Sequence, residues 1–131
     1  MGTIFDPRRM RKRLGFAVSP AWPRIHTIDG HTAGEPLRLI VDGFPAPHGT
    51  TMLEKRRWVR ENHDTLRRAL MWEPRGHADM YGCILTEPVS EDGDVGVLFM
   101  HNEGLSTMCG HGIIGLVMIG FDAGILESDD A

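Results

Sequence analysis

The sequence predicts a mixed α/β domain of the α+β kind, in which a mixed sheet is wrapped around a central apolar helix. Alternating or β-branched segments typical of strands lie at residues 24–29, 37–41, 80–87 and 94–101. Residues 51–59 open with a helix-capping pattern and then space apolar and charged side chains as a helix does. Residues 113–121 are apolar on every side, which indicates a helix buried in a core.

Composition bounds the size of the domain and excludes some functions. The chain has 131 residues, of which 41% are hydrophobic and 24% are charged, enough for one modest globular domain. A formal net charge of -4 argues against general nucleic-acid binding, which needs a basic face. No segment approaches the roughly 18 apolar residues of a membrane-spanning helix.

Residues 1–23 differ from the rest of the chain because basic side chains crowd between positions 8 and 13. We interpret residues 1–23 as a basic, mobile leader and residues 24–131 as the domain. The leader lacks the apolar core of a secretory signal, and the chain has only two cysteines. We therefore expect a reducing, cytoplasmic setting.

The first half of the domain is expected to contain two strands. The first is predicted at residues 24–29 and the second at residues 37–41. Between them, the segment GHTAGEP (residues 30–36) is predicted to be a loop, because its two glycines and its proline interrupt regular structure.

Two helices are expected next. Thr51, with Glu54 three residues later, matches a capping box and predicts the start of the first helix. Leu53 and Trp58 are expected to face inward from it. Asp64 is expected to cap a second, shorter helix.

The second half is expected to be sheet followed by one helix. Strands are predicted at residues 80–87 and 94–101, joined by the turn-rich segment PVSEDGD. The apolar helix begins after Cys109, and residues 124–127 resemble the start of a further strand.

The segment STMCGHGI (residues 106–113) carries the most chemistry. Cys109 stands at the N-terminal end of the predicted helix, where the field of the helix favours thiolate over thiol. The unpaired amides of Gly110, His111 and Gly112 form an expected cradle for a carboxylate. A base beside an anion site suits removal of a proton from the carbon next to a carboxylate.

Other interpretations of these residues stay open. A cysteine between a methionine and a glycine is often a small core residue, and Cys83, within a predicted strand, is read as core. Cys109 and His111 are also two candidate metal ligands. They lack a CxxC or HExxH partner in the sequence, so a metal site is not expected.

Three longer segments resemble the proline racemase family: HTAGEPLRLIVDG, EPRGHADMYG and HNEGLSTMCGHGIIG. That family includes proline racemases, 4-hydroxyproline epimerases and trans-3-hydroxy-L-proline dehydratases. The residues around Glu35 and Tyr81 resemble the dehydratase branch most, because epimerases tend to carry methionine or asparagine at the first position and serine at the second. The resemblance extends from about His26 to about Leu126.

The resemblance implies a fold like that of diaminopimelate epimerase. Such proteins have two similar α/β lobes, each with a central helix wrapped by sheet, and an active site between the lobes. It also implies that Cys109 is a catalytic acid/base and that Gly110 and His111 contact the substrate, with Gly112 as a weaker addition. No cofactor or metal is implied, and the expected partner is a small cyclic imino acid such as hydroxyproline or proline.

Family chains are more than twice as long, so the present chain corresponds to an N-terminal lobe and the second lobe is absent. That second lobe carries the residue that separates dehydratase from epimerase or racemase. The alternative to an enzyme is a truncated, non-catalytic remnant, in which open strand edges favour association into a homodimer.

The polar residues of the segment His31–Glu35 are candidates to line the pocket or, alternatively, to cap their own loop. Two further polar segments are expected to support the site: the EPRGHAD cluster at residues 73–79, and His101–Glu103, which precedes the cysteine motif and is expected to brace it.

Overall fold

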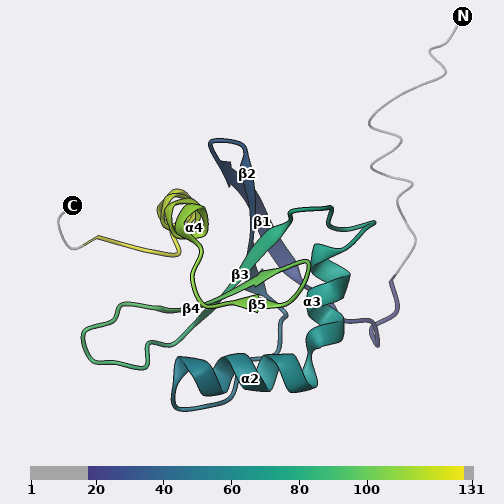
Figure 1. Cartoon of the computed structure of the whole chain (residues 1–131), viewed down its shortest axis with the longest axis horizontal. Coiled ribbons are helices and arrows are strands. Elements are labelled where there is room, and N and C mark those ends of the chain that lie inside the picture. The colour runs from purple at the N-terminus through teal and green to yellow at the C-terminus, as the bar shows by residue number, and fades with distance from the viewer. Residues whose placement is uncertain (1–17, 129–131) are drawn as a thin grey trace, which may run out of the picture.

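A five-stranded mixed sheet forms the centre of the chain, and a computed structural model describes residues 18–128 of it (Figure 1). The basic cluster between positions 8 and 13 lies outside the described residues. The elements are β1 (His26–Thr32), β2 (Glu35–Asp42), α2 (Met52–Asn62), α3 (Asp64–Met71), β3 (Tyr81–Thr86), β4 (Gly96–His101), β5 (Leu105–Ser106) and α4 (Gly110–Asp122). Among the described residues, no helix is long and apolar enough to cross a membrane.

The strands lie side by side in chain order, and only β2 and β3 run parallel. A parallel pair needs a crossover connection, and α2 and α3 occupy the one between β2 and β3. The predicted strands at residues 37–41, 80–87 and 94–101 are confirmed in position, whereas β5 has no counterpart in the prediction.

The predicted loop at residues 30–36 is wrong in extent. β1 continues to Thr32 and β2 begins at Glu35, and these two residues pair across a tight turn. Ala33 and Gly34 make that turn with φ values of 50° and 94°, the left-handed conformation that a two-residue hairpin requires. The glycine adopts it without steric penalty, so the local sequence permits a hairpin as well as an open loop.

The capping box at the start of α2 is confirmed. The Thr51 hydroxyl accepts a hydrogen bond from the Glu54 amide at 3.2 Å, and the Glu54 carboxylate accepts one from the Thr51 amide at 3.2 Å. The inward face is displaced from the predicted one, because Val59 is fully buried whereas Leu53 is 64% exposed. Trp58 is half-buried and packs at the edge of the core.

The predicted cap of α3 is wrong. His63 occupies the N-cap position, and no side chain caps this helix. Asp64 is the first helical residue and instead pairs with Arg67 at 2.6 Å and Arg68 at 3.2 Å.

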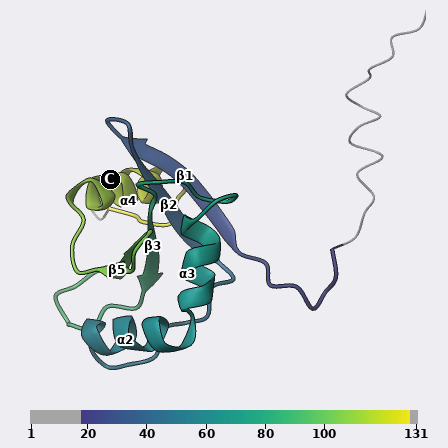
Figure 2. The ribbon, with the colours of Figure 1, turned by 45° about the vertical axis from the view of Figure 1, so that its right-hand side comes forward.

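The sheet has a separate apolar core on each face, because alternate residues of a strand point to opposite sides. On one face, α2 and α3 cover a cluster made by Ile40, Val59, Leu70, Met71, Met80, Ile84, Leu98 and Met100. On the other face, α4 covers a cluster made by Leu37, Leu39, Cys83, Phe99, Cys109 and Leu116. The turned view in Figure 2 separates α4 from α2 and α3.

α4 lies on the sheet through its glycines. A Cβ added at Gly115 would lie 3.1 Å from a methyl carbon of Leu37 and 3.2 Å from the Thr32 hydroxyl oxygen. Opposite the helix, a Cβ added at Gly30 of β1 would lie 2.8 Å from the Ile119 side chain. The absence of side-chain carbon at these points lets the helix backbone approach the strands closely.

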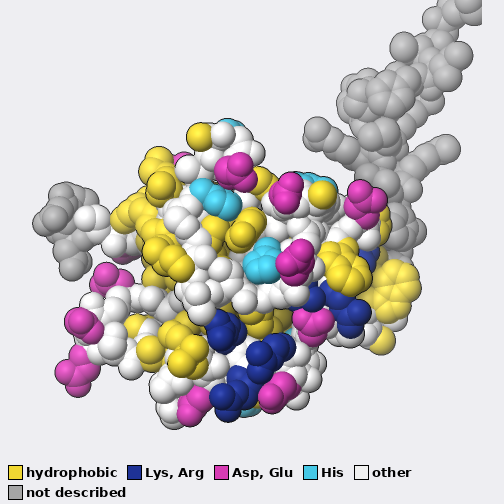
Figure 3. All heavy atoms as spheres, viewed as in Figure 1, with side chains coloured by type: hydrophobic (Ala, Val, Ile, Leu, Met, Phe, Trp, Pro, Cys, Tyr) yellow, Lys and Arg dark blue, Asp and Glu magenta, His cyan; other side chains and the backbone are white. Residues whose placement is uncertain are grey.

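The expectation that this helix is buried on every side is wrong for the described chain. Its outer face is open to solvent and carries a stripe at helical spacing, which we call the α4 outer stripe (Figure 3). The stripe consists of Ile113, Ile114, Val117, Met118 and Phe121. The sheet covers one side of α4, and no described residue covers the stripe enough to bury it.

The predicted strand at residues 124–127 is also wrong. Gly124 has φ 68°, and the amides of Ile125 and Leu126 both donate to the carbonyl of Gly120, at 2.8 and 3.0 Å. These bonds close the end of α4 in the manner of a glycine-containing C-terminal cap. The Leu126 side chain then packs over Gly120.

Candidate active site

The thiol of Cys109 lies at the first turn of α4. Cys109 is the N-cap residue, with an extended backbone (φ -147°, ψ 105°), and its carbonyl accepts the first helical hydrogen bond from Ile113 at 3.0 Å. The residue is 6% exposed, and its side chain makes no capping hydrogen bond of its own. The thiol is therefore carried by the residue that precedes the first helical amides, which the helix leaves without internal partners.

The two glycines beside His111 differ in what surrounds them. A Cβ added at Gly112 would lie 2.9 Å from Cys109 Sγ and 2.8 Å from the Phe99 ring, so only glycine fits under the sulfur. A Cβ added at Gly110 would meet no described atom within 4 Å. The backbone at Gly110 is thus open on its outer side, where a ligand can approach its amide.

The imidazole of His111 lies against the thiol. Nδ1 is 3.5 Å and Nε2 is 3.7 Å from Cys109 Sγ, and Nε2 is also 3.3 Å from the carbonyl oxygen of Pro36. A carbonyl can only accept, so the Pro36 contact assigns the ring proton to Nε2. Both ring nitrogens thus lie near the thiol, and the sulfur is almost equidistant from them.

Two strands besides β2 contact this histidine, and a third supports one of them. The Thr32 hydroxyl of β1 donates to the His111 carbonyl at 2.9 Å. The Tyr81 ring of β3 meets the imidazole edge-on, with centroids 4.9 Å apart, and the His101 ring of β4 lies 5.6 Å from Tyr81 on a tilted plane. The roles of Pro36 and of the Tyr81 ring were not foreseen, because both depend on strand register, which no local pattern encodes.

Cys83 confirms the interpretation as a core residue. It is fully buried in β3, in the same apolar cluster as Cys109, and both thiols are free. Burial and, to a smaller extent, the neighbouring Cys109 together raise the pKa of the Cys83 thiol to about 12. The two cysteines thus share one cluster but differ in surroundings: one contacts apolar side chains and the other an imidazole at a helix end.

The polar segments expected to line or support the site make separate hydrogen bonds in the structure. His31 accepts a hydrogen bond from the Gly34 amide at 3.0 Å and closes its own turn. The EPRGHAD cluster is held from outside: Arg38 donates to the Arg75 carbonyl at 2.7 Å, and Asn102 donates to the His77 carbonyl at 2.8 Å. None of these hydrogen bonds involves the thiol of Cys109.

The described surface has hollows elsewhere. One of about 590 Å³ is lined by residues of the segment before β1 and of α3, and another of about 340 Å³ by the ends of β2 and β3. Neither of these two hollows is lined by Cys109 or His111. Within residues 18–128, no three histidine, cysteine or acidic side chains form a group that could hold a metal ion.

Comparison with known proteins gives curated relatives that include several named as hydroxyproline dehydratases. The chain is 57% identical to the trans-L-3-hydroxyproline dehydratase of Xenopus tropicalis over 106 residues, which are 81% of this chain and 30% of the relative. It is 58% identical to the trans-3-hydroxy-L-proline dehydratase of Bacillus thuringiensis subsp. konkukian over 101 residues, 77% of this chain and 30% of the relative. The chain thus spans less than a third of the length of these relatives.

Solved structures match the same part of the chain. A hydroxyproline epimerase from Agrobacterium vitis, with bound trans-4-OH-L-proline, superposes with a TM-score of 0.73 at 20% identity, over 81% of this chain and 32% of that one. A probable proline racemase from Agrobacterium radiobacter K84, with bound carbonate, gives a TM-score of 0.73 at 26% identity, over 82% and 32%. The first of these likenesses concerns the fold alone.

The length of the matched segment, as well as the sequence identity, shows the family of the chain. Residues 27–131 match the sequence profile described as proline racemase, and this range includes every strand and helix of the structure except the first residue of β1. The chain belongs to the proline racemase family, as a partial fold of that family's type.

Proposed function

We propose that the protein carrying this chain removes the α-proton of a cyclic imino acid with the thiolate of Cys109, in a reaction like that of trans-3-hydroxy-L-proline dehydratase. One observation carries the proposal: the thiol lies at the start of α4, 3.5 Å from the His111 imidazole and beside the open backbone of Gly110. The names of the relatives supply the substrate class.

The proposed step begins with a proton on the thiol and a free Nδ1 on His111. The imidazole takes the thiol proton, and the resulting thiolate takes the α-proton of the substrate, so that the carbon–hydrogen electron pair remains on the ring carbon. The amides of Gly110 and His111 hold the carboxylate and stabilise the charge that spreads onto it. In the dehydratase version, the 3-hydroxyl then leaves with a proton as water, and the unsaturated ring rearranges to a cyclic imine.

Epimerase and racemase versions share the first half of this reaction. They return a proton to the opposite face of the carbon, which requires a second base. The chain matches about 30% of the length of these relatives, and we propose that the residue deciding among the three outcomes corresponds to a part of the relatives that this chain does not match. We propose the dehydratase version because the relatives named above are dehydratases at 57% and 58% identity.

The test is turnover of trans-3-hydroxy-L-proline, trans-4-hydroxy-L-proline and L-proline by the longest natural protein that contains this chain, with a Cys109→Ser variant beside it. Loss of the proposed base is expected to reduce the rate by about 10²–10⁴-fold. Cys83→Ala is the matched control, because it removes the neighbouring buried thiol and leaves the helix end intact. Equal rates for the unaltered protein and Cys109→Ser would show that Cys109 is not the base.

A second candidate is a non-catalytic partial protein that associates with itself. The α4 outer stripe supports this candidate, because contiguous exposed apolar side chains favour association. We propose a homodimer for the isolated chain. Sedimentation of the purified 131-residue chain tests it, with Met118→Glu expected to shift the equilibrium toward monomer. Turnover by the isolated chain would remove this candidate.

We further propose that the protein works in a reducing, cytoplasmic compartment and without nucleic acid. Two free thiols support the first part, and a net charge of -4 supports the second. Fractionation of cells with an antibody against the chain tests the location, and a gel-shift titration with duplex DNA tests the binding.

A further inference from the structure

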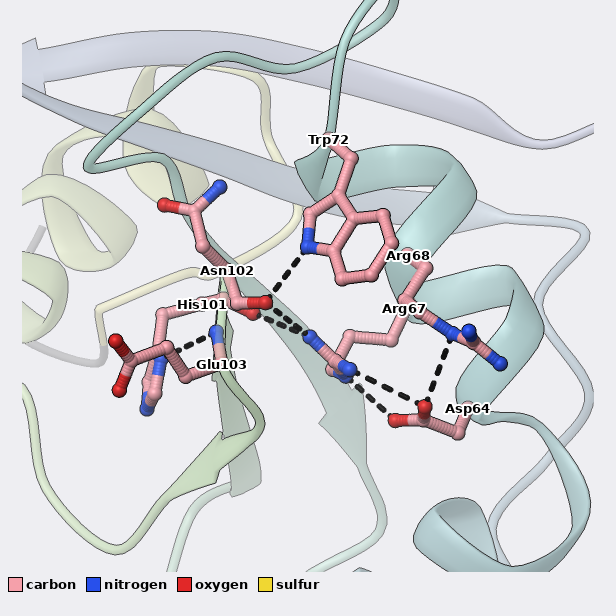
Figure 4. A network of polar contacts seen from close by, with 7 residues as sticks. All are labelled: Asp64, Arg67, Arg68, Trp72, His101, Asn102 and Glu103. Atoms are coloured by element: carbon pink, nitrogen blue, oxygen red, sulfur yellow. Dashed lines mark hydrogen bonds and ion pairs between the residues drawn. The ribbon is translucent and has the colours of Figure 1, made fainter.

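A network of polar contacts at Asn102 joins α3 to the turn after β4 (Figure 4). The side-chain amide of Asn102 donates to the carbonyl oxygens of Met71 and His77, both at 2.8 Å. Its Oδ1 accepts from the amide of Met80 at 3.0 Å. One side chain thus uses both amide hydrogens and its carbonyl oxygen on backbone groups at the end of α3 and in the segment between α3 and β3.

The backbone of Asn102 is held from α3 and from the residue after it. Arg67 Nη1 donates to the carbonyls of His101 and Asn102, at 2.9 and 2.8 Å, and Trp72 Nε1 donates to the Asn102 carbonyl at 2.7 Å. Arg67 is 4% exposed and is paired with Asp64 at 2.6 Å. A buried guanidinium with all these acceptors is costly to displace, so the turn after β4 is fixed against α3.

The network touches the end of the β3–β4 ladder that carries the rings of the site. Tyr81 and His101 are the last paired residues of that ladder, and the bond between Met80 and Asn102 closes it. The Tyr81 ring contacts the imidazole of His111, which lies against the thiol of Cys109. Asn102 therefore stands next to both strand residues whose positions set the Tyr81 ring.

We propose that Asn102 is a positioning residue: its hydrogen bonds fix the end of β3, and thereby the Tyr81 ring that holds the His111 imidazole against Cys109. The inference rests on the proposed pairing of Cys109 with His111. It gives the polar turn after β4 a role in the reactivity of the thiol, beyond stabilising the fold.

The test measures the rate at which iodoacetamide alkylates Cys109 in the intact chain at neutral pH, read by peptide mass spectrometry. Asn102→Asp keeps the shape and the acceptor for Met80 but removes both donors and sets a carboxylate oxygen against a carbonyl. If the imidazole loses its place, the thiol ionises less, and the rate is expected to fall about three- to tenfold.

The double substitution distinguishes positioning from general loosening. In a His111→Asn background the imidazole is already gone, so Asn102→Asp is expected to cause no further fall. A merely structural role would open the buried thiol and raise the rate in both backgrounds. A rate that rises, an equal fall in both backgrounds, or a His111→Asn chain alkylated as fast as the unaltered chain would each overturn the proposal.

Two further variants serve as controls: one lies outside the network, and one weakens the network less than Asn102→Asp does. Thr51→Ala removes the cap of α2, which touches no residue of the network, and is expected to leave the alkylation rate unchanged. Trp72→Phe removes one bond to the Asn102 carbonyl and keeps the side-chain bonds; if Asn102→Asp does not fold, this variant is expected to lower the rate in the same direction, by less. An unchanged rate in Trp72→Phe would then count against the network.

Alkylation needs no turnover, so this test is separate from that of the proposed function. Absence of turnover with a normal alkylation pattern would refute the activity and leave the positioning role standing. Normal turnover, together with an alkylation rate of Cys109 in Asn102→Asp equal to that in the unaltered chain, would refute the positioning role and leave the activity standing.

Discussion

The two faces of the sheet differ in how their helices pack against the strands and in what those helices expose to water. On the face covered by α2 and α3, apolar side chains fill the space between helix and strand, and the outer surfaces of both helices carry charge. On the face covered by α4, the helix contributes glycines, the closest approach is backbone to side chain, and the outer surface is apolar. The first face presents charged helix surfaces to water, whereas the second exposes apolar surface and carries the candidate site.

This difference separates stability from chemistry within one small domain. The α2/α3 face contains no free thiol and includes two fully buried methionines, Met71 and Met100. The α4 face includes both cysteines and the helix end that Cys109 caps. The comparison predicts that substitutions on the first face change the free energy of unfolding most, and that substitutions on the second change thiol reactivity most.

The largest effect is expected from Met100→Ala. This side chain is fully buried between β4 and the helices, so its removal should lower the free energy of unfolding by about 2–5 kcal/mol. Ile114→Ala in the α4 outer stripe is the matched control: Ile114 is 56% exposed and should change stability by no more than about 0.5 kcal/mol. Urea unfolding followed by circular dichroism measures both, and equal losses would erase the contrast between the faces.

An intermediate effect is expected from Gly115→Val. The added carbons would press on Leu37 and on the Thr32 hydroxyl and push α4 away from the sheet, at a cost of about 1–3 kcal/mol. Thr32 also binds the His111 carbonyl, so the same variant should alter the alkylation rate of Cys109. Gly104→Val, where a Cβ would meet nothing within 4 Å, is the comparison for added bulk alone. Unchanged stability and unchanged alkylation in Gly115→Val would mean that α4 is not closely packed.

The smallest effect concerns pH. The hydrogen bonds from Arg38 hold the pKa of Asp29 below its ordinary value of 3.8. The stability gained from a lowered carboxyl pKa is present above the unfolded-state value and is lost as pH falls through the folded-state value. Because the Asp29 side chain is 52% exposed, the loss should be only about 0.2–1 kcal/mol.

Asp29→Asn is expected to flatten that part of the pH dependence below about pH 4. Urea unfolding at neutral pH and near pH 3 measures this loss of stability. Glu87→Gln serves as the control, because it removes an exposed carboxylate that Arg38 does not bind. An Asp29→Asn chain that loses as much stability on acidification as the unaltered chain would show that the pair contributes nothing.

Local patterns predicted the elements better than they predicted their contacts. Strand alternation around Cys83 and Phe99 and the capping box at Thr51 involve neighbours in sequence, and both are confirmed. The inward face of α2 was misjudged by placing Leu53 inside, because the position of the helix on the sheet, and not the helix itself, decides which residue is buried.

The candidate site was predictable in part for the same reason. Cys109 at the start of a helix is a local feature, and the structure places it there. The imidazole–thiol contact, the Pro36 carbonyl and the Tyr81 ring come together only through the pairing of β2, β3 and β4 and the docking of α4. The all-round burial expected for α4 depends on what lies against its outer stripe, which its own sequence does not contain.

The most direct test of the central claim compares the two thiols in one native chain. Iodoacetamide labelling across a pH series, with each cysteine peptide quantified, should show Cys109 modified at neutral pH faster than the same thiol in the urea-unfolded chain. Cys83, whose pKa burial raises to about 12, should stay unmodified until the chain unfolds. If Cys109 is modified no faster when native than when unfolded, the ionised thiol at the helix end, and the function proposed from it, is contradicted.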